Sequence, residues 1–319
     1  MTITVNFPKE VLWVERYRPI RIAETILPET TKRQFQKFVD DETVPNLLLA
    51  GPPGTGKTTS AQAMFEEIGA DYITINASNE GRSMETLRND IATFASTVSF
   101  TGGRKYVILD EADYLPAATV QPALRNFMEQ FSENCGFIMT CNYPNKIIDP
   151  LHSRMSLIRF NIPKTEKAKL AMQFFKRLQE ILTNEGIEFE KEALSAFVTK
   201  YFPDWRRALN ELQLYSAGGK IDSGILIAHD TDVKELIKLM KKKDFTATRK
   251  WVAENADIEA SVLYRSLFDR LPTELKSESE IATAIIILAE YQYKEAFVAD
   301  TEINRTAALA TLMGELNSW

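Results

Sequence analysis

The segment from residue 51 to residue 58 constrains the fold more than any other part of the chain. It reads Gly-Pro-Pro-Gly-Thr-Gly-Lys-Thr and lies between an apolar run, residues 47–50, and a helix-like run, residues 59–68. This strand–loop–helix context is the one that a phosphate-binding P-loop requires, because glycines let backbone N–H groups turn inward at the positive end of a helix dipole. The pattern predicts that Lys57 reaches the β- and γ-phosphates of a nucleotide and that Thr58 holds Mg²⁺. The alternative is a glycine-rich turn without a ligand.

A second segment, residues 106–113, joins an apolar strand to acidic residues. It reads Tyr-Val-Ile-Leu-Asp-Glu-Ala-Asp. Ligands of a parallel sheet bind beyond the carboxyl ends of its strands, so Asp110 and Glu111 are expected beside the P-loop. One carboxylate then supports Mg²⁺ while its neighbour polarises a water molecule for attack on the γ-phosphate. A buried strand that ends in surface acids is the common alternative.

Strand-like and helix-like segments alternate over the first half of the chain. Strands are expected at residues 47–50, 71–75, 106–109, 136–140 and 157–160, with helices at 31–39, 83–96 and 117–131. This alternation predicts an α/β fold with a mostly parallel sheet and helices on both faces. Asn142 follows one strand, where its amide is placed to donate to a phosphate or to orient water. A turn asparagine before Pro144 is the alternative.

The segment from residue 12 to residue 19 reads Leu-Trp-Val-Glu-Arg-Tyr-Arg-Pro. Because Pro19 disfavours helix at Arg18, we expect an extended edge there rather than a helix. On residue type alone, Trp13 and Tyr17 are as well explained as core residues that pack an N-terminal arm.

Beyond Pro163 the expected strands largely disappear. Helices are predicted at residues 165–184, 190–201 and 204–217, and further helices at 232–242, 245–255, 258–270, 279–299 and 302–316. We therefore expect three domains: residues 1–161, the α/β domain; 162–224, a small helical domain; and 225–319, an all-helical unit for oligomerisation. Separate core packing within a monomer is the alternative for the last unit, and the sequence indicates no chemistry beyond about residue 220.

Composition bounds the class of protein. The 319 residues are 45% hydrophobic and 26% charged, which is typical of a soluble protein. The apolar run 285–289 is too short to cross a bilayer, and the N-terminus lacks the order of a signal peptide, so we expect a cytoplasmic protein without a membrane partner. Cys135 and Cys141 are expected to be reduced thiols rather than zinc ligands. The net charge of −6 argues against coating nucleic acid by bulk charge, but not against placed basic residues.

Taken in order, these segments resemble the AAA+ ATPase subunits of sliding-clamp loaders, as in replication factor C and the loader of T-even phages. The resemblance covers about residues 11–215. It rests on segments that look like the family's adenine box, the loop after its second strand, Walker B, the helix that follows, sensor 1 and the arginine-finger motif: residues 13–19, 76–81, 110–113, 121–129, 141–143 and Ser153-Arg154.

The resemblance implies a role for each matching residue. ATP is held by Trp13, Tyr17, Arg18, Gly51, Pro52, Pro53, Gly54, Thr55, Gly56, Lys57, Thr58 and Thr59. Asp110 and Thr58 support Mg²⁺, Glu111 activates water and Asn142 senses the γ-phosphate. Arg206, in a segment similar to sensor 2, contacts the phosphates of its own subunit.

Arginines that act on a neighbouring subunit are also implied. Arg154 would serve the neighbour's nucleotide as an arginine finger in trans, with Arg125 as a second contact across the interface. Without the resemblance, Arg154 is a surface cation near Asp149. Met155 stands where the family usually has Cys, and Pro203 where it usually has Gly. Pro203 is a good helix-entry residue, so Arg206 is still expected on the first turn of the lid helix. The form of that segment favours the phage branch.

The resemblance further implies four partners: other copies of the chain in an open ring, a companion clamp-loader subunit, a ring-shaped sliding clamp, and primer–template DNA. Residues near two helix N-termini are DNA-binding candidates, namely Arg82, Ser83, Arg88, Ala118 and Thr119. Val98 and Phe100 are clamp-binding candidates; for Phe100, an ordinary packed loop residue is the alternative.

Two rival functions remain at this point. Another AAA+ DNA-remodelling ATPase, such as a branch-migration helicase, needs the same motifs, but such helicases carry an extra hairpin before sensor 1 that the segment 113–136 has little room for. The other rival is a structural ring subunit with a silent ATP site. The presence of Lys57, Glu111 and Asn142 argues against it.

Overall fold

The computed structural model describes residues 12–78, 84–99, 102–227, 231–256, 258, 260–275 and 277–316 of the chain. By its internal contacts the chain divides into two compact units, residues 1–225 and 226–319. The first unit holds a sheet, its flanking helices and a group of three helices that follows them. The second unit is helical.

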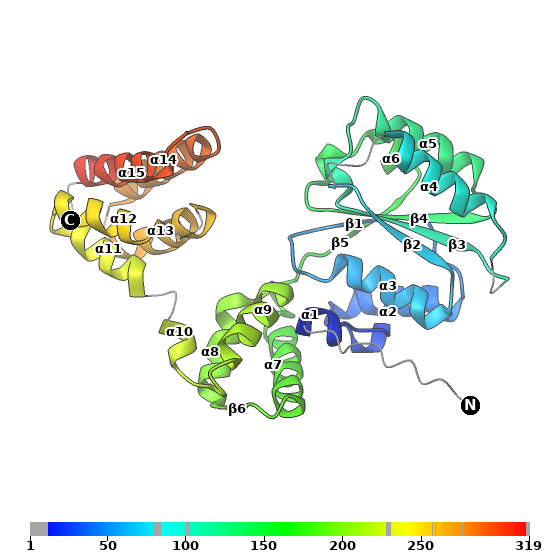
Figure 1. The fold of residues 1–319 in the computed structure, drawn as a ribbon, viewed down its shortest axis with the longest axis horizontal. Helices are drawn as coiled ribbons and strands as arrows, with labels where there is room; N and C mark the ends of the chain where they lie inside the picture. The colour runs from blue at the N-terminus through cyan, green and yellow to red at the C-terminus, as the bar shows by residue number, and fades with distance from the viewer. Residues whose placement is uncertain are drawn as a thin grey trace. The chain divides into compact units, whose positions relative to one another are not determined.

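A five-stranded parallel sheet forms the centre of the first unit (Figure 1). Its strands are β1 (Leu47–Ala50), β2 (Tyr72–Asn76), β3 (Lys105–Asp110), β4 (Cys135–Cys141) and β5 (Ser156–Arg159). Their spatial order is β2-β3-β4-β1-β5, with parallel pairing throughout. The predicted α/β fold with a parallel sheet is therefore confirmed.

Helices cover both faces of this sheet. Figure 1 shows α2 (Glu29–Asp40) and α3 (Lys57–Ile68) on one side, and α4 (Met84–Ser96), α5 (Val120–Gln130) and the short α6 (Asp149–His152) on the other. Because successive side chains of a strand point to opposite faces, Leu47 and Leu49 pack in the core under α2 and α3, whereas Leu48 and Ala50 pack under α4 and α5. This explains why the strands read as unbroken apolar runs.

Three helices follow the sheet: α7 (Lys167–Asn184), α8 (Lys191–Tyr201) and α9 (Trp205–Ser216). Their ends lie within two residues of the predicted ones. A small parallel pair of strands, β6 (Glu188–Phe189) and β7 (Lys220–Ile221), was not predicted; β7 follows α9 and precedes α10 (Gly224–Ile227).

The prediction of an extended N-terminal segment was wrong. Residues Trp13–Arg16 form a one-turn helix, α1, which ends with Tyr17 as its C-cap. Pro19 restricts only the residue before it, and Arg18 already lies beyond the helix. The turn is stabilised because the indole of Trp13 is buried, with 4% exposed, and its backbone N–H donates to Gln213 Oε1 at 2.9 Å.

The described residues of the second unit from 231 onward form five helices: α11 (Thr231–Lys241), α12 (Phe245–Glu254), α13 (Ala260–Glu274), α14 (Glu278–Glu295) and α15 (Thr301–Glu315). They share one apolar core. Within the described ranges of the chain, no helix is long and apolar enough to cross a membrane.

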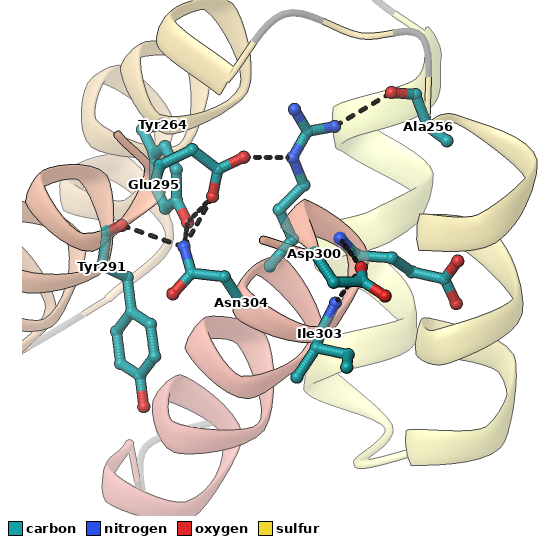
Figure 2. Close-up of polar contacts among 9 residues, drawn as sticks. Ala256, Tyr264, Tyr291, Glu295, Asp300, Ile303 and Asn304 are labelled. Atoms are coloured by element: carbon teal, nitrogen blue, oxygen red, sulfur yellow. Dashed lines mark hydrogen bonds and ion pairs between the residues drawn. The ribbon is translucent and has the colours of Figure 1, made fainter. Parts of the chain in front are cut away.

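A buried polar network ties α13, α14 and α15 together (Figure 2). Arg305 Nε donates to Glu295 Oε1 at 2.8 Å, and the two side chains are 7% and 9% exposed. Asn304 Nδ2 donates to the other carboxylate oxygen at 2.5 Å, and the Tyr264 hydroxyl donates to it at 3.3 Å. Burial and this carboxylate raise the pKa of Tyr264. The network also reaches the loop after α12, because Arg305 Nη1 donates to the carbonyl of Ala256 at 3.3 Å.

Replacing Arg305 with methionine is expected to destabilise the second unit by about 3–5 kcal/mol, because the buried Glu295 carboxylate loses its cation. Hydrogen exchange of the α14 amides in the full chain measures this. The exposed pair Arg265–Asp269 is the matched control, since Arg265→Met is expected to cost less than about 1 kcal/mol. An Arg305→Met variant as stable as the control would contradict the assignment of this pair as a structural anchor.

Candidate functional site

The carboxyl ends of three neighbouring strands meet at one edge of the sheet. Ala50 of β1 lies opposite Cys141 of β4, and Leu109 of β3 lies opposite Met139 of β4. The segments that follow these strands, which start at Gly51, Asp110 and Asn142, are therefore side by side, as expected for a ligand site in a parallel α/β sheet.

The P-loop connects β1 to α3. Gly54 and Gly56 have φ values of +72° and +90°, in the left-handed region that favours glycine, and α3 begins at Lys57. A Cβ at Gly54 would lie 1.7 Å from Asp204 Oδ1, so this position also needs glycine for space. The loop thus sets backbone N–H groups at the N-terminus of a 12-residue helix, which is an anion-binding arrangement.

Lys57 points back across this loop. Its ammonium donates to the carbonyls of Gly51 and Pro52, both at 2.8 Å, and to Asn142 Oδ1 at 2.9 Å. Burial lowers the pKa of Lys57, and the nearby carboxylate of Asp110 opposes that shift. The lysine and the sensor 1 asparagine, 85 residues apart in sequence, therefore share one polar cluster.

Asp110 lies beside the start of α3. Its Oδ1 accepts hydrogen bonds from the hydroxyls of Thr58 and Thr140, both at 2.6 Å. Carboxylate and hydroxyl oxygens are ligands that suit Mg²⁺, which usually takes few protein ligands beside substrate phosphates and water. Thr58 and Asp110 therefore fit the predicted metal site. Thr140, whose hydroxyl donates to Asp110, was not predicted from the sequence. Its signal was its place one residue before the end of β4, level with Asp110.

Glu111 leaves the strand in a strained conformation. Its φ and ψ are 58° and 42°, left-handed for a residue that has a Cβ, and its N–H donates to Thr140 Oγ1 at 3.1 Å. Such backbone strain persists where the surroundings fix it, and it concentrates at functional sites.

Asp113 holds the segment after β4, Asn142 and Tyr143, close to the end of β3. Its Oδ2 accepts from the backbone N–H groups of Asn142 and Tyr143 at 3.3 and 3.2 Å, and the residue is 6% exposed. Sequence reasoning assigned Asp113 to the acidic motif without this role. The contact positions Asn142 by its backbone while its side chain faces Lys57.

The three-helix group closes the site from the other side. Arg206 lies in the first turn of α9 and lines the same cavity as Lys57, and the N–H of Trp205 donates to the Gly54 carbonyl at 3.1 Å. Asp204 is the N-cap of α9, with its side chain accepting from Arg207 N at 3.0 Å. Pro203 precedes the cap, so it does not displace Arg206 from the helix start.

The N-terminal segment borders the cavity with two of its three predicted residues. Tyr17 and Arg18 line it, whereas Trp13 is buried beneath and is absent from the lining as far as the structure describes it. The Tyr17 hydroxyl donates to Glu185 Oε1 at 2.5 Å, and burial raises the pKa of Tyr17. Glu185, at the end of α7, was not singled out from the sequence.

Together these segments enclose a cavity of about 1170 Å³, counting space open to solvent. Its lining includes most of the residues predicted to bind nucleotide: Pro53, Gly54, Thr55, Gly56, Lys57, Thr58, Thr59, Asp110, Glu111, Asn142 and Arg206. Gly51 and Pro52 contribute through carbonyls that accept from Lys57. A cavity lined by both apolar and polar residues suits a nucleotide.

Arg154 and Arg125 lie elsewhere. Neither lines the described cavity, and both contact Glu129 of α5. Arg154 follows α6, and Arg125 lies one turn before Glu129. The structure thus separates these two residues from the nucleotide site of their own chain.

Of the DNA- and clamp-binding candidates, the structure describes only some. Arg82, Ser83 and Phe100 lie outside the described residues, and of Arg88 only the helical backbone within α4 is described. Ala118 and Thr119 are exposed just before α5, which begins at Val120 rather than at the predicted residue 117, with Thr119 as its N-cap. Val98 is 88% exposed. The two cysteines are free and buried, and burial raises the pKa of each to about 11, so neither is a thiolate at neutral pH.

Comparison with protein families gives two matches. The family described as "ATPase family associated with various cellular activities (AAA)" matches residues 47–163. The family described as "Sliding-clamp-loader large subunit, AAA+ ATPase lid domain" matches residues 166–227. The boundary between the matches falls between β5 and α7.

Similar proteins extend over nearly the whole chain. The sliding-clamp-loader large subunit of Enterobacteria phage T4 is 35% identical over 95% of this chain and 95% of its own length. That of Escherichia phage RB69 is 37% identical over 90% and 89%. The replication factor C small subunit of Sulfurisphaera tokodaii is 32% identical over 97% of both. Among solved structures, a mutant of Thermotoga maritima RuvB covers 78% of this chain and 85% of its own with a TM-score of 0.54 at 17% identity, which is a likeness of fold alone.

Proposed function

Since the chain belongs to the AAA+ ATPase subunits of sliding-clamp loaders, we propose that it binds ATP to open a ring-shaped clamp on primer–template DNA and hydrolyses ATP to release it. The observation that carries the proposal is the single cavity shared by Lys57, Asp110, Glu111 and Asn142. In this account several copies form an open ring with a companion subunit.

The residues around the cavity divide the work of hydrolysis. Lys57 and the P-loop N–H groups bind the β- and γ-phosphates, and Asn142 orients the γ-phosphate. Thr58 and Asp110 would hold Mg²⁺, and the ion would neutralise charge on the phosphates. Glu111 accepts a proton from a water molecule while the water oxygen attacks the γ-phosphorus. The bond between the γ-phosphorus and the β–γ bridging oxygen breaks, and ADP leaves with that oxygen.

Arg154 completes the site of the neighbouring subunit. A guanidinium at the γ-phosphate stabilises charge that develops in the transition state, and Arg154 does not line the cavity of its own chain. Each ATP then lies at a seam between two protomers, so turnover reports whether neighbours are correctly spaced. Arg206 contacts the phosphates in cis, and Arg125 makes a second contact across the seam.

We assign the DNA and clamp contacts to residues near the ends of α4 and the start of α5. Ala118 and Thr119, exposed just before α5, are assigned to the DNA backbone, as are Ser83 and the basic residues Arg82 and Arg88 before and within α4. Val98, exposed after α4, and Phe100 offer apolar contacts to the clamp.

Steady-state ATPase assays of the assembled particle test the proposal. Clamp and primed DNA together are expected to stimulate turnover more than the product of their separate effects. The control is a particle in which every copy of the chain carries Lys57→Ala, which removes the phosphate-binding ammonium. It should stay inactive with clamp, with primed DNA and with both. Translocation along DNA without any response to a clamp would favour a helicase, and absence of turnover would favour a silent scaffold.

A further inference from the structure

Glu129 lies between the two arginines that the proposed function assigns to the neighbouring subunit. Arg154 Nε donates to Glu129 Oε1 at 3.0 Å, and Arg154 Nη2 contacts the same oxygen. Arg125 Nε is 3.5 Å from that oxygen as well. Since one carboxylate faces two guanidinium groups, the cluster keeps a net positive charge, as a phosphate-binding surface requires.

The contacts of Arg154 fix its side chain without using all of its donors. Besides the contacts to Glu129, Nη1 donates to the Pro150 carbonyl at 2.8 Å and to Ser153 Oγ at 3.3 Å. A guanidinium has five N–H donors, so four contacts leave at least one N–H, on Nη2, for a further acceptor. These contacts hold the Arg154 side chain in place, and it can still donate to a phosphate.

Glu129 lies on a helix, α5, that is packed against the core. Helix α5 packs Leu124, Phe127 and Met128 into the core under the sheet, each 7% exposed or less. Arg154, in contrast, follows the four-residue α6 and is 30% exposed in its side chain. A long arginine in such a place loses much rotamer freedom when it is held, which is costly unless a fixed partner offsets it. Arg154 lowers the pKa of Glu129, so the partner stays charged at neutral pH.

We propose that Glu129 is a positioning residue of the site in trans: it directs Arg154 toward the nucleotide of the neighbouring subunit. Glu129 does not contact that nucleotide itself. This inference rests on the proposed function, because it requires Arg154 to act across the seam. It assigns to α5 a part in catalysis that the motif alone does not give.

The test is the ATPase activity of the assembled particle with clamp and primed DNA. Glu129→Ala is expected to lower kcat about tenfold, because a misdirected guanidinium loses much of its effect. ATP binding by the isolated subunit should not change. Glu129→Gln keeps an acceptor oxygen and should fall between wild type and Glu129→Ala. The matched control is Glu133→Gln, an exposed acid three residues beyond the end of α5, which should have wild-type kcat.

A double variant separates this proposal from the one on which it rests. If Glu129 acts through Arg154, then Glu129→Ala combined with Arg154→Ala should have the kcat of Arg154→Ala alone. Wild-type kcat in both Glu129 variants, with a slow Arg154→Ala particle, would overturn the positioning role and leave the seam intact. A further loss in the double variant would also overturn it. A fast Arg154→Ala particle would remove the proposed seam itself.

Discussion

Replacing Glu111 with glutamine is expected to lower kcat of the assembled particle by about 10³-fold, because the amide cannot accept a proton from the attacking water. ATP binding should persist, since Lys57, Thr58 and the P-loop N–H groups that hold the phosphates are unchanged. Asp110 is not expected to replace Glu111, because its Oδ1 already accepts hydrogen bonds from the hydroxyls of Thr58 and Thr140.

Single-turnover hydrolysis and nucleotide binding, measured on the same preparation, check this result. Glu192→Gln, an exposed acid on α8, is the control and should leave both unchanged. Should Glu111→Gln hydrolyse ATP within a few-fold of wild type, water activation would have to be assigned to another group.

Replacing Arg154 with alanine is expected to have an effect of similar size, with kcat falling by about 10³-fold in the assembled particle. The physical reason is the loss of a cation beside the γ-phosphate as charge develops on its oxygens. Arg154→Lys should recover only part of the rate, because an ammonium lacks the planar fork of the guanidinium.

The isolated subunit provides the contrast. Its affinity for ATP should be the same with and without Arg154, because this side chain does not line its own chain's cavity. Fluorescent-nucleotide titration of the isolated subunit, beside turnover by the particle, separates the two effects. A loss of ATP affinity in the isolated variant would place Arg154 at its own nucleotide and contradict the assignment in trans.

The parts of the fold predicted best were those with strong local signals. The strands of the sheet are short apolar runs between turn residues, and the P-loop has fixed residue types in a fixed context. Parallel pairing then implies that Gly51, Asp110 and Asn142 lie at one edge, since the carboxyl ends of the strands must coincide. Helices α7, α8 and α9 carry clear amphipathic periods and end signals.

The features that sequence reasoning missed depend on contacts between distant segments. Helix α1 is one turn long and is stabilised by the burial of Trp13 against Gln213, 200 residues later. The two-residue strands β6 and β7 are too short to have a period. Thr140, Asp113 and Glu185 have ordinary residue types, and only the fold shows what they contact.

The second unit illustrates the same limit. Its five helices follow from periodicity, but the sequence indicated no special role for Arg305 or Glu295, which are ten residues apart. Charged residues at helix ends are mostly solvated, and only the packing of α13, α14 and α15 buries this pair. Its network was therefore beyond prediction from one sequence.

In the proposed mechanism, ATP is hydrolysed at a seam, with Lys57 from one protomer and Arg154 from the next. Its most direct test is a mixing experiment with two inactive variants, Lys57→Ala and Arg154→Ala. In a mixed particle, some seams join the intact P-loop of an Arg154→Ala subunit to the intact arginine of a Lys57→Ala subunit. Mixing is expected to restore DNA- and clamp-stimulated ATPase activity that neither variant has alone. Mixed particles as inactive as the separate ones would show that Lys57 and Arg154 do not act at one seam.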